Sequence, residues 1–440
     1  MNIAIAGYGK EGRASLEYFR GKFPDAKFTI FDENPAIVIP SEFEKSGEVK
    51  SVLGEGVFDQ IEGFDLVVRT AGLAPRKIAQ IDKHWSSTRE FFAECPAQII
   101  GVTGTKGKGT TASFITEILR AAGKKVHLLG NIGVPALEIL PRIMADDVVV
   151  YELSSFQLWD MEQSPHVAVM TLIEPDHLDV HEDFAEYIKA KSRIFTFQKP
   201  GDIAIYNEQD ALVKEMIENP NKQNEVVKIP FLNKKFVHID QGKFYYNEIE
   251  ICPTSVVKLP GEHNLRNAAA AISAVWEMID ANADAIARGL SAFDGLPHRL
   301  KFVREVGRVK FYDDSIATTP GSAIAAARSF HEPKILIVGG HDKGADYHQL
   351  GEVIDQTNVR QIFAIGANRQ KVAEQIGAAT NTSIVQLDSQ NLAEIVQMAN
   401  RAAEPGDVVI LSPAAASFDM FRNYEDRGEQ FIAAVKDLLE

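Results

Sequence analysis

The sequence predicts an α/β protein with parallel sheets, arranged as three domains. Short β-branched runs alternate with helical patterns and glycine-rich turns, which is typical of parallel sheets. Each of three blocks, residues 1–92, 93–297 and 298–440, also opens with a new strand and a glycine or polar turn. The predicted strands are Asn2–Ala6, Leu66–Arg69, Gln98–Thr103, Val148–Glu152, Val167–Leu172, Lys334–Val338, Gln361–Ile365 and Val408–Ser412.

Composition argues against several classes of function. The 440 residues are 45% hydrophobic and 24% charged, as in an ordinary globular protein, and the net charge of -15 argues against a nucleic-acid surface. The two cysteines are isolated, so neither a disulfide framework nor a cysteine-based zinc site is expected. There is no signal-peptide pattern and no stretch of roughly 18 apolar residues that would span a membrane. We therefore expect a cytoplasmic protein without a membrane span.

The first block carries a glycine turn between a strand and a helix. Gly7, Gly9 and Gly12 have the spacing of a dinucleotide-binding turn, and Asp32 lies at the end of the next strand, 20 residues after Gly12. In such a site the glycines let the backbone approach a diphosphate, and the acidic side chain contacts a ribose. The pattern fits NAD, another nucleotide diphosphate, or a glycine turn that binds nothing.

The second block opens with a stronger signal, GVTGTKGKGTTA, between a strand and an amphipathic helix. Its three glycines allow backbone N–H groups to converge on phosphate oxygens; they are Gly104, Gly107 and Gly109. Lys108 supplies a positive charge for the β- and γ-phosphates, and Thr110 or Thr111 can hold Mg²⁺. The loop is atypical, because valine replaces the first glycine of a standard phosphate loop and a glycine follows the lysine.

Two functional side chains follow neighbouring predicted strands. Glu152 ends the strand Val148–Glu152, and His177 comes after Val167–Leu172. Ligands gather beyond the carboxyl ends of parallel strands. Glu152 is therefore placed to coordinate Mg²⁺, and His177 to coordinate it or to contact the substrate. The alternatives are a capping carboxylate and a hydrogen-bonded loop histidine.

The remaining polar clusters are individually weaker. Asn264 and Asn267 are three residues apart near the start of an alanine-rich helix, Leu265–Ile279, which is expected to be buried. They share a face that suits base or ribose contacts, although ordinary N-capping is the alternative. Asp314 lies in an Asp-Asp-Ser sequence at a strand end, which is also compatible with a simple turn.

Taken together, these motifs resemble the Mur ligases, and among them the branch that adds D-glutamate. The resemblance covers essentially the whole chain, in the family's order. ELSSFQL and the NIG-x-PAL pattern are its most specific parts. The residues that carry it are TGTKGKGTT (103–111), NIGVPAL (131–137), YELSSFQL (151–158), EPDHLD (174–179), AKSRIF with Lys191, GEHNLRN (261–267), PHR (297–299), DDSIAT (313–318), GGHDKGAD (339–346) and SPAAASFDMF (412–421).

The resemblance implies an N-terminal Rossmann-like domain that binds UDP, a central ATP-binding domain and a C-terminal Rossmann-like domain that brings the amino acid. It also implies the reaction, in which ATP activates UDP-N-acetylmuramoyl-L-alanine as an acyl phosphate and D-glutamate then attacks, in peptidoglycan synthesis. The chain is expected to be a monomer whose partners are small molecules. The positions implied for the UDP substrate are Lys10, Glu11, Asp32, Thr70, Gly72, Asn131 and His177.

For the other ligands the resemblance implies three further sets of positions. Those for ATP are Gly104, Thr105, Lys106, Gly107, Lys108, Gly109, Thr110, Thr111, Asn264, Asn267, Arg299 and Asp314. Those for catalysis are Lys108, Glu152, His177 and Lys191, and those for glutamate are Lys343, Ser417 and Tyr424. Lys191 is implied to be carbamylated by CO₂, so that with Thr110, Glu152 and His177 it holds two Mg²⁺ ions. Without the resemblance, Lys191 would be interpreted as an exposed helix lysine.

Two departures keep alternatives open. Gly109 after the lysine also occurs in folylpolyglutamate synthases, although those lack a leading UDP-type domain. Ile316 stands where lysine is common and Tyr424 where phenylalanine is common, so the choice between D- and L-glutamate stays open. A nicotinamide oxidoreductase would explain the first glycine turn but not the phosphate loop. A non-catalytic nucleotide-binding protein would not need Glu152 and Lys191.

Overall fold

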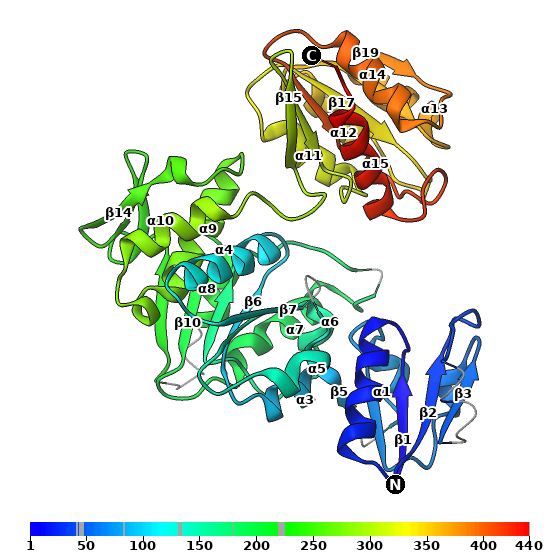
Figure 1. Cartoon of the computed structure of the whole chain (residues 1–440), viewed down its shortest axis with the longest axis vertical. Helices are drawn as coiled ribbons and strands as arrows, with labels where there is room; N and C mark the ends of the chain where they lie inside the picture. Colours follow the sequence, from blue (N-terminus) through cyan, green and yellow to red (C-terminus); the bar gives the residue numbers. More distant parts are fainter. Residues whose placement is uncertain are drawn as a thin grey trace. The chain divides into compact units, whose positions relative to one another are not determined.

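The protein forms two compact units in a computed structural model that describes residues 1–40, 43, 48–81, 84–130, 134–178, 180–218 and 225–439. The first unit comprises Met1–Val257 with Leu265–Phe293, and the second comprises Lys258–Asn264 with residues 294–440. Figure 1 traces both units from the N-terminus in blue to the C-terminus in red. Within the described part of the chain, no helix is long and apolar enough to cross a membrane.

The first unit begins with a five-stranded parallel sheet of order β3-β2-β1-β4-β5. Its strands are β1 (Asn2–Ala6), β2 (Lys27–Asp32), β3 (Val49–Leu53), β4 (Leu66–Arg69) and β5 (His84–Ser86), with helix α1 (Lys10–Lys22) and the 3-10 helices η1 (Val57–Gln60) and η2 (Pro75–Ile78). The strand order reverses direction between β1 and β4. This is the switch point at which α/β sheets bind ligands beyond their carboxyl ends.

A second parallel sheet, of order β11-β10-β9-β6-β8-β7, completes most of the first unit. Its strands are β6 (Gln98–Thr103), β7 (Val126–Gly130), β8 (Val148–Glu152), β9 (Val167–Met170), β10 (Ile203–Asn207) and β11 (Val227–Phe231). The accompanying α-helices are α3 (Ser87–Glu94), α4 (Lys108–Ala121), α5 (Ala136–Ile139), α6 (Ser155–Leu158), α7 (Phe184–Thr196), α8 (Ala211–Glu218), α9 (Glu262–Val275) and α10 (Ala283–Ala292). The 3-10 helices are η3 (Leu140–Arg142), η4 (Thr254–Val256) and η5 (Glu277–Ile279), and a small antiparallel sheet contains β12 (Val237–Asp240), β13 (Lys243–Tyr246) and β14 (Ile249–Pro253).

The predicted strands and the predicted helix of the first unit are confirmed, except that one strand and the helix differ in length from the prediction. The strand predicted over Val167–Leu172 ends at Met170, and the Thr171 hydroxyl that follows it donates to the Lys106 carbonyl of the phosphate loop at 2.6 Å. The helix predicted over Leu265–Ile279 runs from Glu262 to Val275 and is followed by η5. Its alanines at 268–271 are fully buried, as predicted.

The second unit contains a six-stranded sheet of order β15-β16-β20-β17-β18-β19. Only the β15–β16 pair is antiparallel in this sheet. The strands are β15 (Lys301–Val306), β16 (Val309–Asp313), β17 (Lys334–Gly339), β18 (Val359–Ile365), β19 (Ser383–Gln386) and β20 (Val408–Leu411), and the helices are α11 (Pro320–Arg328), α12 (His348–Ile354), α13 (Arg369–Gly377), α14 (Leu392–Ala402) and α15 (Tyr424–Lys436). The predicted strands of the third block are thus confirmed to within about two residues.

Close backbone packing explains two of the three glycines in the first turn. Gly7 has a φ of +91°, and a Cβ at Gly12 would lie 2.1 Å from the Gly7 carbonyl oxygen. A Cβ at Gly9 would meet nothing within 4 Å, and Gly9 has an ordinary φ of -72°. The Tyr8 N–H donates to Asp32 Oδ2 at 2.6 Å. The turn therefore packs α1 tightly against β1 while Asp32 fixes its conformation.

This packing predicts that Gly12→Ala destabilises the protein and that Gly9→Ala does not. The Gly12 contact is with backbone and cannot be relieved by a side-chain rotation, so the cost should lie near the upper end of the roughly 1–3 kcal/mol of overpacking. The thermal unfolding midpoint of the full chain should fall by about 5 °C or more for Gly12→Ala. Equal midpoints for the two variants would contradict this interpretation.

Candidate functional site

The phosphate loop between β6 and α4 is held by glycines and by the turn after β9. A Cβ at Gly104 would lie 2.0 Å from Thr171 Oγ1, and one at Gly107 would lie 2.3 Å from Asn267 Oδ1. The Thr105 N–H donates to the Leu172 carbonyl at 2.7 Å. Gly107 precedes α4 with a φ of +84°, and no side chain caps the helix. The first N–H groups of a fourteen-residue helix are therefore not capped by a side chain, which is the arrangement that favours phosphate binding.

Two lysines of the loop differ in their contacts. Lys108 Nζ donates to the Thr105 carbonyl at 3.0 Å, which keeps the ammonium over the loop. Lys106 Nζ instead pairs with Glu174 at 2.7 Å, and both side chains are largely exposed. Of the two, Lys108 is the one whose ammonium stays against the backbone of the loop.

The first turn of α4 carries two threonine hydroxyls, at Thr110 and Thr111, whereas Gly109 has no side chain. Thr110 and Thr111 are both buried. Among the described residues, the Thr111 hydroxyl has no hydrogen-bond partner. A buried polar group without a partner is costly and is uncommon in folded proteins. The turn thus contains an unsatisfied oxygen close to where the sequence predicts that Thr110 holds a metal.

Lys191 of α7 is buried rather than exposed, which overturns the interpretation of it as a surface lysine. Lys191 is only 1% exposed. Its Nζ lies 3.3 Å from Thr103 Oγ1, at the end of β6, and 5.0 Å from the ring centroid of Tyr187. Burial, and secondarily the positive charge of Lys108, hold the pKa of Lys191 well below its usual value, with Glu152 opposing the shift. The amine is therefore readily deprotonated.

Glu152 ends β8 and His177 follows β9, two strands of the same sheet with β6 between them, and the two side chains differ in burial. Glu152 ends β8 and is 4% exposed. The His177 side chain is 48% exposed, and its ring centroid lies 5.0 Å from that of Phe156. His177 also has a φ of +54°, a conformation that is uncommon for a residue other than glycine and that occurs often at functional sites. The described residues contain no group of three or more His, Cys, Asp or Glu that could hold a metal ion.

Five of the residues predicted for a UDP group lie at or just after the carboxyl ends of β1, β2 and β4, whereas His177 follows β9. Glu11 Oε2 accepts from the Ala71 N–H at 2.9 Å, and Asp32 accepts from the N–H groups of Tyr8 and Asn34. The Thr70 hydroxyl donates to the Ala6 carbonyl at 3.2 Å, and a Cβ at Gly72 would meet nothing within 4 Å. Lys10 is exposed at the start of α1. Asn131 lies outside the described residues.

In the second unit, Asp314 lies at the carboxyl end of β16, beside the end of β20. Asp314 accepts from Ser412 Oγ at 2.8 Å and from the Leu300 N–H at 3.1 Å. Burial raises the pKa of Asp314 to about 7. The neighbouring Asp313 accepts from His298 Nδ1 at 2.7 Å, and this bond raises the pKa of His298.

The predicted glutamate positions are spread over three segments of the second unit. Ser417 is buried after β20, and Tyr424 begins α15. Lys343 is exposed, with Nζ 5.5 Å from the ring centroid of Phe418. Arg299 is exposed, and Asn264 donates from Nδ2 to the Pro260 carbonyl at 2.7 Å.

Arg427 of α15 is a residue that the sequence reasoning missed. It is 1% exposed and donates to Ser315 Oγ and to the carbonyls of Ser315, Ala415 and Ala416 at 2.8–3.3 Å. Burial lowers its pKa to about 10. The guanidinium thus fixes the two loops that carry Asp314 and Ser417. A lone arginine in an amphipathic helix gives no sequence signal of this role.

Comparisons with known proteins agree on one family. The Mur ligase middle domain matches residues 102–275, and the Mur ligase glutamate ligase domain matches residues 298–415. The UDP-N-acetylmuramoylalanine--D-glutamate ligase of Acetivibrio thermocellus is 38% identical over 99% of this chain and 96% of its own length.

Solved structures show the same fold at much lower identity. UDP-N-acetylmuramate-alanine ligase MurC from Thermotoga maritima is 14% identical, with a TM-score of 0.59 and coverage of 99% of both chains. FolC of E. coli, in complex with DHPP and ADP, is 18% identical, with a TM-score of 0.58 over 80% of this chain and 92% of its own.

The burial of Asp314 predicts a stability that depends on pH. Its pKa is raised from 3.8 to about 7 in the folded chain, so the stabilisation present below pH 3.8 is lost as the pH rises through 7. Asn at this position would accept from Leu300 and donate to Ser412. Asp314→Asn should therefore raise the thermal unfolding midpoint of the protein at pH 8, by the equivalent of about 2–4 kcal/mol, and the gain should vanish towards pH 4.

Asp342→Asn is the matched control for this measurement. Hydrogen bonds from the Gly344 N–H and Lys371 lower the pKa of the exposed Asp342, so that substitution should give no gain at pH 8. A lower midpoint for Asp314→Asn at every pH would contradict the expected penalty.

Proposed function

This chain belongs to the Mur ligase family, and on that premise we propose that it is an ATP-dependent, ADP-forming ligase that joins D-glutamate to UDP-N-acetylmuramoyl-L-alanine. The reaction serves peptidoglycan synthesis. Its use of ATP supports a cytoplasmic location, and a monomer with small-molecule partners is sufficient for it. The relative from Acetivibrio thermocellus carries this activity in its name.

One observation carries the chemical part of the proposal. Lys191, a buried lysine with a lowered pKa, lies beside the end of β6, where the phosphate loop begins, and interacts with Lys108 and Glu152. A lysine without a role at the site would be expected at the surface, where water solvates its ammonium. Buried ionisable groups with perturbed pKa values cluster at functional sites, which supports a catalytic role.

The first step transfers the γ-phosphoryl group of ATP to the L-alanyl carboxylate. A carboxylate oxygen forms the new bond to phosphorus, the bond to the β,γ-bridging oxygen breaks, and ADP leaves. Both reactants are anionic, so positioning and charge screening dominate the barrier. The N–H groups of the phosphate loop and Lys108 supply both. A Cβ at Gly107 would lie 2.3 Å from Asn267 Oδ1, and this closeness of Asn267 to the phosphate loop supports its assignment to ATP, to which we also assign Asn264.

The second step forms the amide. The neutral amine of glutamate attacks the acyl carbon, phosphate leaves from the tetrahedral intermediate, and the nitrogen loses a proton. We assign Lys343, Ser417 and Tyr424 to glutamate, and Arg299 and Asp314 to ATP. The hydrogen bonds that Arg427 donates to Ser315 and Ala415 order the two loops and support a preorganised site in the second unit.

We further propose that Lys191 is carbamylated and that Thr110, Glu152, His177 and the carbamate hold Mg²⁺. The neutral amine attacks CO₂, a nitrogen–carbon bond forms and a proton leaves, so a buried neutral amine becomes an anion. The buried glutamate and the unsatisfied hydroxyl of Thr111 fit a cation at this position. When bound, Mg²⁺ neutralises phosphate charge and orients the transferred group.

Finer assignments of the UDP contacts and of the domains follow from the same premise. The five-stranded sheet with its switch point supports a Rossmann-like domain for UDP, with Lys10, Glu11, Asp32, Thr70, Gly72, Asn131 and His177 as its contacts. Residues 93–297 then form the ATP domain and residues 298–440 the glutamate domain.

The activity predicts phosphate release from ATP that requires both UDP-N-acetylmuramoyl-L-alanine and D-glutamate, with Mg²⁺ present. Parallel reactions with L-glutamate and with tetrahydrofolate plus glutamate should release none above background. Release with L-glutamate alone would transfer the proposal to the other enantiomer, in keeping with Ile316. Release only with the folate would overturn it.

Carbamylation predicts that Lys191→Ala lowers turnover by about 100-fold or more and that added bicarbonate restores little of it. The unaltered protein equilibrated with ¹³C-bicarbonate should give a carbamate carbon signal by NMR that Lys191→Ala lacks. Lys189→Ala, which removes an exposed lysine of the same helix, should keep both signal and activity. Near-normal turnover in Lys191→Ala would rule out the assignment.

A further inference from the structure

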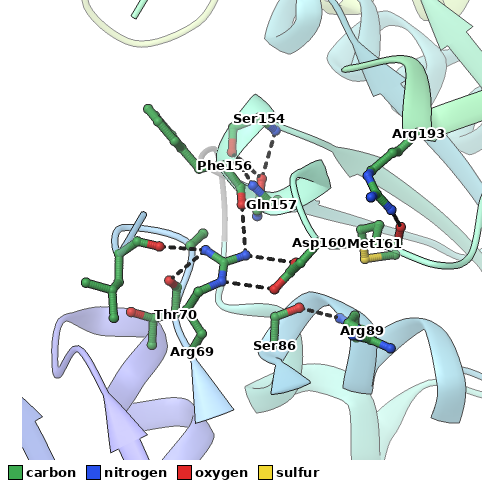
Figure 2. A network of polar contacts seen from close by, with 12 residues as sticks. Arg69, Thr70, Ser86, Arg89, Ser154, Phe156, Gln157, Asp160, Met161 and Arg193 are labelled. Carbon is green, nitrogen blue, oxygen red and sulfur yellow. Dashed lines mark hydrogen bonds and ion pairs between the residues drawn. The ribbon is translucent and has the colours of Figure 1, made fainter. Parts of the chain in front are cut away.

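A buried arginine connects the first sheet of the first unit to the loop that follows β8. Arg69 is fully buried at the end of β4. Its Nε and Nη2 donate to the two carboxylate oxygens of Asp160 at 3.0 and 2.9 Å. Figure 2 shows the two groups facing each other in this two-point arrangement. Asp160 lies just beyond α6, and its side chain is 8% exposed.

The same guanidinium also fixes backbone on both sides of this contact. Nη1 donates to the carbonyls of Thr70 and Leu73 at 3.2 and 2.7 Å, and Nη2 donates to the Phe156 carbonyl at 3.0 Å. A guanidinium carries five N–H donors in a rigid plane. The nitrogens make five hydrogen bonds, so the position of loop 70–73 is tied to that of residues 156–160 (Figure 2).

The two segments are those on which the proposed substrate would lie. Thr70 and Gly72 are assigned to UDP, and loop 70–73 also receives Glu11, whose carboxylate accepts from the Ala71 N–H. On the other side, the Phe156 ring lies 5.0 Å from the His177 ring. Arg69 itself is covered by its own contacts and touches neither site.

We propose that Arg69 is a positioning residue that holds the UDP-binding loop in register with the β8 end of the central sheet, through Asp160. A substrate with a diphosphate at one end and a reacting carboxylate at the other needs a fixed distance between the two sites. The planar, two-point pair sets that distance, which a flexible ammonium would not do. This inference rests on the proposed function.

The first test uses Asp160→Asn, which leaves the Arg69 bonds to Thr70 and Leu73 available. The KM for UDP-N-acetylmuramoyl-L-alanine should rise at least tenfold, while the KM for ATP and the inhibition constant of UDP alone stay within twofold. If the Arg69–Asp160 pair were purely structural, Asp160→Asn would lower thermal stability without raising the KM for the UDP substrate selectively. An equal rise in the KM and in the UDP inhibition constant would mean disorder of the loop instead, and would overturn the register.

Two further variants separate stability from positioning. Arg69→Met with Asp160→Leu removes both buried charges, so thermal stability should approach that of the unaltered protein while the KM for the UDP substrate remains at least tenfold raised. Arg89→Gln is the control, because Arg89 pairs with the largely exposed Glu162, which lies two residues after Asp160. This variant should change neither the thermal stability nor the KM for the UDP substrate. A double variant with normal stability and a normal KM would overturn the proposal.

A measurement without substrate keeps the inference independent of the activity. In Asp160→Asn, backbone amide exchange should accelerate in residues 70–74 and 155–160 together, and not in α4. Unchanged exchange in both segments would overturn the register even if the ligase reaction were demonstrated. Absence of ligase activity in the unaltered protein, with coupled exchange intact, would instead count against the proposed function alone.

Discussion

Desolvation of ionisable side chains near the ends of the strands is the constraint on which the candidate site depends. Burial penalises a charge, so the lysine amine of Lys191 loses its proton readily and the carboxyl of Asp314 keeps one up to about neutral pH. Each group thereby gains a chemistry that its exposed counterpart lacks: an amine able to attack CO₂, and a carboxyl able to donate. Arg427 is buried to a similar degree, and its charge is instead surrounded by carbonyl oxygens.

Backbone proximity is the second constraint, and it acts through glycine. At Gly12 and Gly104 a Cβ would collide with a carbonyl or hydroxyl oxygen of a neighbouring segment. The turns can therefore pack closely against the neighbouring segments. Packing by itself already requires glycine at these positions, which is why the first glycine turn left NAD, another nucleotide diphosphate and a turn that binds nothing as alternatives.

The Arg69–Asp160 pair shows how two sheets of one unit are aligned. Removing a buried charge pair as a whole is often tolerated, whereas removing one partner is not. Such a pair therefore contributes little to net stability but restricts the relative position of the segments that carry it. In this protein those segments are the loop after β4 and the residues in and after α6, which the Arg69 contacts hold together.

The sequence by itself determined the eight strands that it predicted, to within about two residues, and the glycine turns that follow β1 and β6, because β-branched runs and glycine turns are local signals. β1, β4, β6 and β8 have the predicted bounds. Only the tertiary structure decided that Lys191 is buried, since a residue on a mixed helix can face either way. It alone paired Arg69 with a residue 91 positions away and Arg427 with Ser315, 112 positions away. Contacts at such separations leave no periodicity in a sequence, and pKa values follow from burial that only folding creates.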